Sequence, residues 1–352
     1  IVITFNADGN DYFNQISFLT ETNGQKMDNH FISAIESYPQ GTARESILSI
    51  AKGAQPLYET YNVGNQLTPY YLKLVEGDSV AETMIHRKYS SVQARVDHLA
   101  DIQADMDIYA GALTYRSHIN LFRTLLRTIT AEACIIAMLL TIYLLGYEKI
   151  HKTEGYFAAT TTGRELDQIK LRVALISGTG CYLLIVGLSL CIYFAHWNYS
   201  GIWVANVSSQ LNMITDLMLT KPFITWVDFT VKEYLTATIA ASIVLVVVAV
   251  LFAGTIGIVV KNTYVAGLLT LLIPGMGLFA TTVFANLKMW TAYLISLLQP
   301  VNIWGAQNVW FTEGGFNAPC KWFEMIGIAI GLTFFSITTM AADHRSRRKD
   351  VL

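Results

Sequence analysis

The sequence predicts an all-α membrane protein, in which a polytopic bundle of transmembrane helices carries a helical extracellular domain. Three observations support this prediction. Hydrophobic residues make up 53% of the 352-residue chain and charged residues 14%, which is too apolar for an ordinary soluble protein and too charged for a wholly embedded one. Five apolar stretches, each long enough to cross a bilayer, follow residue 118. The preceding residues are polar.

Residues 1–118 form the predicted extracellular domain. Proline and glycine residues divide its first part into short helices and turns. From Val80 to Leu113, apolar residues recur mostly at spacings of three and four, while aspartates occupy another face. This pattern predicts a long amphipathic helix that packs on its neighbours. The alternative is a coiled-coil contact with a second subunit, for which the run covers few heptads.

Five transmembrane helices are expected in the rest of the chain. Their apolar parts are Ile129–Gly146, Val173–Phe194, Leu235–Val260, Tyr264–Phe284 and Phe323–Met340. The first belongs to a helical segment over 119–146, and the others lie within 173–342. The chain starts with the apolar residues IVITF, with no initiator Met or export signal before them. We therefore expect a sixth span upstream of Ile1 in the full protein.

Positive charges predict the orientation of the spans. Lysines and arginines gather in three places, which are residues 147–172, the short link 261–264 and the tail 343–352. The positive-inside rule assigns these segments to the cytoplasm. Residues 1–118 and the loop 195–234 then lie outside, and the expected location is the plasma membrane.

Segment 286–322 contains an apolar run that is too short to cross a bilayer. This run, Ala292–Leu298, ends at Gln299–Pro300 and is followed by glycines and aromatic residues. The pattern predicts an external re-entrant or surface hairpin. Non-helical backbone at membrane depth requires that protein buries it or that water reaches it.

Two places in the spans are candidates for functional polar or bending sites. Arg127 and Glu132 lie about one turn apart near the start of the first span. They are either a polar site on a translocation path or a structural pair whose Arg extends to the headgroup layer. Pro274 and Gly275 predict a bend near mid-membrane. This bend is either a hinge for gating or a static kink.

The stretch 147–172, YEKIHKTEGYFAATTTGRELDQIKLR, is polar and mostly cationic, and an apolar run flanks it on each side. We expect a short surface helix between two spans. Such a helix, continuous with a span at each end, can transmit a push from a docked soluble domain. The alternative is that Lys149 and Lys152 merely hold the loop in the cytoplasm.

The order of residues in this stretch resembles the cytoplasmic coupling helix of the type-two ABC exporter permeases. The residues that carry the resemblance are Glu148, Glu154, Thr161, Gly163, Arg164, Glu165 and Lys170. The Pro-Phe stretch 221–235 before a span, the external re-entrant piece and the basic tail are similar to that family too. The large outer domain is typical of its Gram-positive forms that handle peptides or lipids.

The resemblance implies a fold, partners and contact residues. Two permease subunits, alike or related, form a path between them, and each docks a separate ABC ATP-binding subunit through its coupling helix. The implied docking contacts are Glu148, Glu154, Tyr156, Phe157, Arg164 and Glu165. The chain lacks a Gly-x-x-x-x-Gly-Lys-Ser/Thr motif, so ATP and Mg²⁺ belong to the partner and this chain is expected to bind no cofactor.

Other function classes are disfavoured by the sequence. The net charge of −2 argues against a nucleic-acid partner. Scattered histidines and cysteines, Cys320 among them, show neither metal-ligand spacing nor a catalytic arrangement, so no enzyme is expected. A secondary transporter requires paired polar residues at mid-membrane, and Glu132 alone does not provide them. A mechanotransmitting or sensing membrane subunit that works with the same ATPase stays open.

Overall fold

The computed structural model describes residues 26–36, 42–107, 109, 118–153, 165–197, 199, 202–210 and 212–349. The chain divides into two compact units. We call residues 1–124, 189–238 and 308–322 the polar unit, and residues 125–188, 239–307 and 323–352 the bundle unit. The polar unit thus combines three separate stretches of the chain, which overlap the predicted outer domain 1–118, the predicted external loop 195–234 and the predicted external segment 286–322.

Within the residues that the structure describes, five helices are long and apolar enough to cross a membrane. A π-helical turn, η2 (Ile119–Leu126), leads into the first of them. The spanning helices are α6 (Arg127–His151), α8 (Leu166–His196), α9 (Val231–Val259), α10 (Thr263–Asn286) and α13 (Phe323–Lys349). The prediction of a helical, polytopic membrane protein with five spans in this sequence is confirmed at this level. Most of the helices extend past the predicted apolar parts, because polar residues at their ends continue the helix instead of stopping it.

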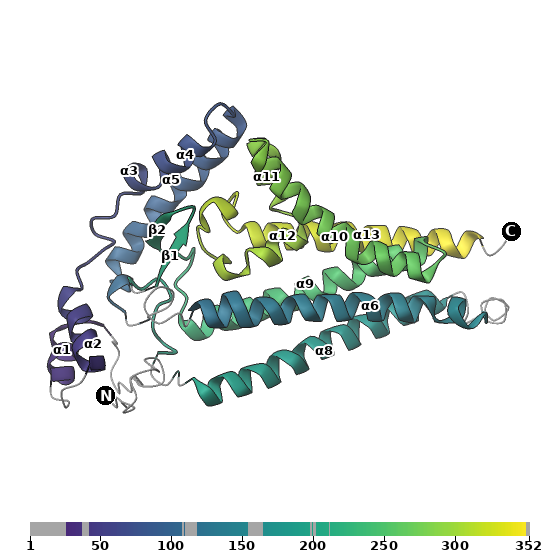
Figure 1. Cartoon of the computed structure of the whole chain (residues 1–352), viewed down its shortest axis with the longest axis horizontal. Coiled ribbons are helices and arrows are strands. Elements are labelled where there is room, and N and C mark those ends of the chain that lie inside the picture. Colours follow the sequence, from purple (N-terminus) through teal and green to yellow (C-terminus); the bar gives the residue numbers. More distant parts are fainter. Residues whose placement is uncertain are drawn as a thin grey trace. The chain divides into compact units, whose positions relative to one another are not determined.

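Figure 1 shows the backbones of the long helices α6, α8 and α9. Small residues bring these helices close together. A Cβ atom added to Gly257 of α9 would lie 2.8 Å from Leu145 Cδ1 of α6, and one added to Gly178 of α8 would lie 3.0 Å from Ala137 Cβ. Close approach at small residues is the usual way in which membrane helices pack, since lipid offers no hydrophobic driving force between them. Met138, Ile142, Ala253, Ile256 and Ala266 form a core shared by α6, α9 and α10.

Two short helices follow α10, where the sequence predicted a re-entrant or surface hairpin. They are α11 (Trp290–Ser296) and α12 (Pro300–Gly305). Asn302 Nδ2 donates hydrogen bonds to Thr281 Oγ1 of α10 and to the carbonyl of Ser296, both at 2.8 Å. These bonds fix the turn between the two short helices against α10. The depth of the hairpin in a bilayer stays a prediction.

The polar unit is mainly helical and contains one β-hairpin. Its described elements are α1 (Asn29–Glu36), α2 (Thr42–Gly53), α3 (Val63–Gln66), α4 (Thr68–Leu74), α5 (Ser79–Asp101), η1 (Ala104–Met106), β1 (Met213–Asp216), β2 (Leu219–Pro222) and η5 (Gly315–Asn317). The 3-10 turn η4 (Gln307–Val309) begins one residue before the 308–322 stretch of this unit. Strands β1 and β2 pair antiparallel, with Met213 opposite Pro222 and Asp216 opposite Leu219. The hairpin lies in the loop 195–234, for which the sequence predicted no strands.

Helix α5 is the long amphipathic helix that the apolar spacing predicted. Val92, Val96 and Leu99 on its apolar face are fully buried within the chain. That face is therefore covered by the protein's own side chains, which agrees with packing and not with a coiled coil. The helix ends at Asp101, short of the predicted Leu113, because Gln103 adopts a left-handed backbone with φ of 52°.

Candidate functional site

An ion pair joins the two helices that flank the predicted coupling segment. Glu148 lies in the last turn of α6, and Lys170 lies near the start of α8. Lys170 Nζ donates a hydrogen bond to Glu148 Oε2, and each side chain is only 11% exposed. A pair with so little solvent around it holds both side chains firmly, because separating it would leave two poorly hydrated charges. The ends of α6 and α8 are therefore joined directly.

Further polar contacts join the same end of the bundle to α9 and α13. Lys149 Nζ donates to the carbonyl of Gly257 on α9 at 3.4 Å. Gln168 Nε2 of α8 donates to Asp343 Oδ2 of α13 at 3.0 Å, and Arg347 Nε lies 3.0 Å from the same oxygen. We call Glu148, Lys149, Gln168, Lys170, Asp343 and Arg347 the base network. It connects four of the five spanning helices at one end.

The structure places two of the six predicted docking residues. Glu148 is buried and bound to Lys170, whereas Glu165 is exposed immediately before α8. Glu154, Tyr156, Phe157 and Arg164 lie outside the described residues. Residues 147–151 belong to α6 and residues 166–172 to α8, so any separate surface helix is confined to the segment between them. Docking through the six residues stays a prediction.

Arg127 and Glu132 point to different surroundings in the structure. Arg127 Nη1 donates to the carbonyl of Gly305 in α12 at 3.3 Å, and Trp304 Nε1 donates to the carbonyl of Arg127 at 2.8 Å. Arg127 thus supports the hairpin helix. Glu132 is exposed on α6, and Ile135 and Ile136 of the next turn are exposed too. A joint polar site of the two residues on a path stays a prediction.

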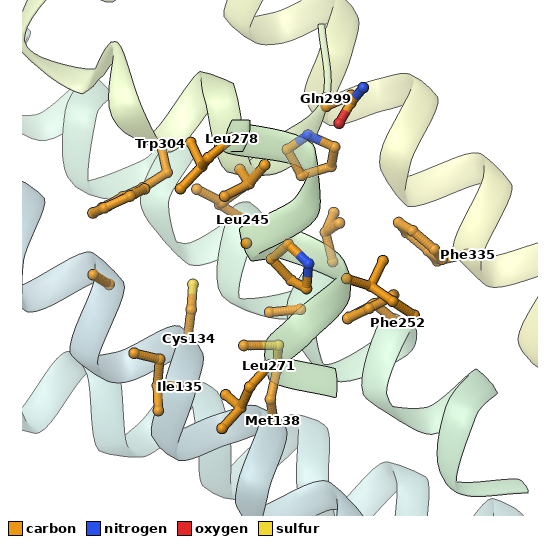
Figure 2. A pocket seen from close by; sticks show the side chains of 18 residues that line it. Cys134, Ile135, Met138, Leu245, Phe252, Leu271, Leu278, Gln299, Trp304 and Phe335 are labelled. Atoms are coloured by element: carbon orange, nitrogen blue, oxygen red, sulfur yellow. The ribbon is translucent and has the colours of Figure 1, made fainter. Parts of the chain in front are cut away.

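A cavity of about 370 Å³ lies within the bundle unit (Figure 2). Its walls come from α6, α9, α10, α12 and α13, and from Gln299 just before α12. The lining residues are Ala131, Cys134, Ile135, Met138, Leu245, Val248, Ala249, Phe252, Leu271, Ile273, Pro274, Gly275, Leu278, Gln299, Pro300, Val301, Trp304 and Phe335. Pro274 and Gly275, the predicted hinge, are among them, and α10 remains one continuous helix across both. Their role in gating stays a prediction.

The polar unit contains a buried cluster of two lysines and two carboxylates. Glu313 forms ion pairs with Lys221 and with Lys88, the latter over 3.6 Å, and Lys221 Nζ lies 3.9 Å from Asp216 Oδ2. Tyr71 donates to Asp216 at 2.7 Å, and Tyr89 donates to Glu313 at 3.2 Å. We call these four charged residues the buried ionic cluster. It connects α5, both strands and the segment that precedes η5.

Burial and pairing act in opposite directions on the charges of this cluster. Burial alone would raise the pKa of Glu313, but Lys221, Lys88 and the N–H of Gly315 lower it below its usual value. Burial lowers the pKa of Lys88 to about 8, against the opposing effect of Glu313. Lys88 Nζ also donates to the carbonyls of Gly315 and Ala318, at 2.5 and 2.9 Å. Every charge therefore has an opposite charge or a hydrogen bond.

Part of these sites carried a signal in the sequence. Lys88 follows Ile85 by three residues and precedes Val92 by four, so it lies on the apolar face of α5, where a charge requires a partner. Gln168 and Asp343 are 175 residues apart, and no local pattern connects them. Within the described residues, no three His, Cys, Asp or Glu side chains are arranged to hold a metal ion. Comparisons with protein-family models, with curated proteins and with solved structures find no match for this chain.

Proposed function

We propose that this chain is the membrane-spanning permease subunit of an ATP-driven exporter of the type-two ABC kind. It would couple ATP hydrolysis by a separate subunit to the export of a peptide, a lipid or another amphipathic substrate. The observation that carries the proposal is the base network. It links α6, α8, α9 and α13 at the end of the bundle from which the predicted coupling segment emerges.

The base network supports a mechanical role for that segment. A displacement of residues 154–164 would act on α6 and α8 together, because the Glu148–Lys170 pair holds their ends in register. The Gln168–Asp343 bond would carry the displacement to α13, and the Lys149–Gly257 bond would carry it to α9. Polar contacts with two discrete arrangements can transmit such a movement between packed helices. In the proposal, this movement opens the translocation path.

The proposal fixes the orientation and the partners of the chain. The base network faces the cytoplasm, and the polar unit lies outside the plasma membrane. Glu148, Glu154, Tyr156, Phe157, Arg164 and Glu165 meet the ABC ATP-binding subunit, which holds ATP and Mg²⁺. A second permease subunit completes the path.

Charge reversal at the coupling segment tests this function. We expect the double variant Arg164→Glu, Glu165→Arg to lose most co-purification with the proposed ATP-binding subunit, because reversed charges repel a complementary surface. Membrane insertion should not change. Lys232→Glu is the matched control, since Lys232 is exposed at the start of α9, at the other end of that helix from Gly257, the contact of Lys149. Unchanged co-purification of the double variant would contradict the proposal.

The alternative is a mechanotransmitting or sensing subunit that acts on the outer side with no path for a substrate. The buried ionic cluster favours it, because a polar unit fixed by paired, buried charges is suited to receive or deliver a force. Both functions use the same ATPase. They differ in whether ATP-dependent movement of an amphipathic substrate occurs in vesicles that contain the complete complex.

A further inference from the structure

The cavity of the bundle unit is almost purely apolar. Its volume of about 370 Å³ falls in the range of about 300–1,000 Å³ that is typical of small-molecule sites. Gln299 and Trp304 are its polar exceptions, and the Trp304 N–H is already bound to the carbonyl of Arg127. In Figure 2 these two residues lie at the top of the view, and Ile135 and Met138 lie at the bottom. The cavity is therefore suited to a hydrocarbon ligand.

The cavity opens on the side of the bundle unit. Ile135 of α6 and Leu271, Ile273 and Leu278 of α10 line it, and all four are also exposed large hydrophobic residues. They lie within two helices that are long and apolar enough to span a membrane. In a bilayer such a surface meets hydrocarbon and not water. The material next to the opening is then the acyl chains of lipids.

An empty apolar cavity is unfavourable, because the atoms that line it lose dispersion contacts on one side. Water does not relieve this loss, since a buried water requires two to four polar partners, which these walls do not supply. A flexible hydrocarbon chain provides the missing contacts.

We propose that this cavity binds an acyl chain of a bilayer lipid, which inserts from the side of the bundle past Ile135 and Leu271. The occupied cavity separates α10 from α9 and α13 at the level of Pro274 and Gly275. The chain then fills the space that α10 would have to enter in order to move toward its neighbours. This proposal does not depend on the exporter function, because a lipid chain would bind whether or not an ATPase docks.

Photolabelling of the intact protein tests the proposal. The probe is phosphatidylglycerol with a diazirine in its acyl chain, in vesicles of phosphatidylglycerol and phosphatidylethanolamine. We expect labels on Met138 and Val248, which line the cavity but are 7% and 1% exposed. Lipid on the outer surface of the protein does not reach these two side chains. Labels that occur only on the exposed Phe279 would overturn the proposal.

A side chain added at Gly275 tests the cavity directly. A Cβ atom there would meet no atom within 4 Å, and Gly275 lines the cavity, so Gly275→Leu adds a side chain at the cavity wall where the backbone leaves room for it. We expect labelling of Met138 and Val248 to fall about tenfold, which corresponds to about 1.4 kcal/mol of binding. Gly187→Leu is the matched control, because Gly187 of α8 is equally exposed and equally free of neighbours but does not line the cavity.

A second variant and a second probe complete the test. Ile135→Trp narrows the opening from α6 and should reduce the same labels if Gly275→Leu fails to insert. Undiminished labelling in both variants would overturn the proposal. A free fatty acid with the same diazirine is the comparison probe, and labelling by this probe alone would show that the occupant is not a bilayer lipid. Co-purification with the ATP-binding subunit is measured on the same samples, so a failure of the exporter function is distinguished from a failure here.

Discussion

Four buried charged side chains join separate segments of the polar unit. Lys88 and Lys221 supply two positive charges, and Asp216 and Glu313 supply two negative ones. Gly315 lies against them with φ of 60°, and a Cβ atom there would collide with Asp216 Oδ2. Balanced charges of this kind contribute little net stability, yet they make the removal of one member costly. The cluster therefore specifies how the hairpin and the 308–322 stretch pack against α5.

Glu313→Gln should loosen this packing. The substitution removes the negative charge that pairs with both lysines, and we expect a loss of about 3–5 kcal/mol, as for other buried pairs that lose one partner. Hydrogen–deuterium exchange of the intact protein should then accelerate in β1, β2 and residues 308–322, which are held by the cluster. Glu59→Gln is the control, because Glu59 is exposed on the same unit. Equal exchange in the two variants would show that the cluster does not stabilise these segments.

At the scale of elements, the Glu148–Lys170 pair joins α6 to α8, and we expect the effects of substituting its two members on stability to depend on each other. Glu148→Gln and Lys170→Met each leave one poorly solvated charge without its partner, and each should destabilise the bundle by about 3 kcal/mol. The double variant removes both charges, so it should lose less stability than the sum of the two single variants. The melting temperatures of the four proteins in detergent give this comparison. Strictly additive losses would mean that the two side chains do not stabilise each other.

The elements differ in how far the sequence predicts them. The spanning helices could be predicted because a bilayer requires about 20 apolar residues per helix and forbids unpaired backbone groups. The β1–β2 hairpin could not, because its turn residues Leu217 and Met218 both have positive φ without the Gly or Asn that normally marks such a turn. Helix α8 starts at Leu166, seven residues before the predicted apolar part at Val173, because the polar residues that precede this part are helical too.

The candidate site shows the same division. The order of residues along the chain singled out Glu148 and Lys170 but not their pairing, and Gln168 and Asp343 likewise become neighbours only when α8 and α13 pack. The cavity depends on the shapes of side chains from several elements, and no pattern along one of them indicates it. The location of one helix can thus be predicted from the sequence, whereas the side-chain contacts and the cavity formed between distant helices cannot.

At the scale of the whole molecule, the proposed function requires that the polar unit and the base network lie on opposite sides of the membrane. An odd number of spans separates α5 from the tail after α13, since five helices of sufficient length lie between them. The cationic segments 147–172 and 343–352 belong together by the positive-inside rule, and the base network joins their flanking helices at one end of the bundle. The packing thus brings together the two ends that the charge rule assigns to the cytoplasm, and the orientation itself stays a prediction.

Single cysteines at the two ends measure this orientation. In a Cys320→Ser background, Glu59→Cys should react with a membrane-impermeant maleimide on intact cells, because Glu59 is exposed on the polar unit. Arg345→Cys, which is exposed near the end of α13, should react only after the cells are permeabilised. The background chain alone reports any reaction of the cysteines within the spans. Labelling of Arg345→Cys on intact cells would place the base network outside, where no ATP-binding subunit can reach it, and the exporter proposal would then fail.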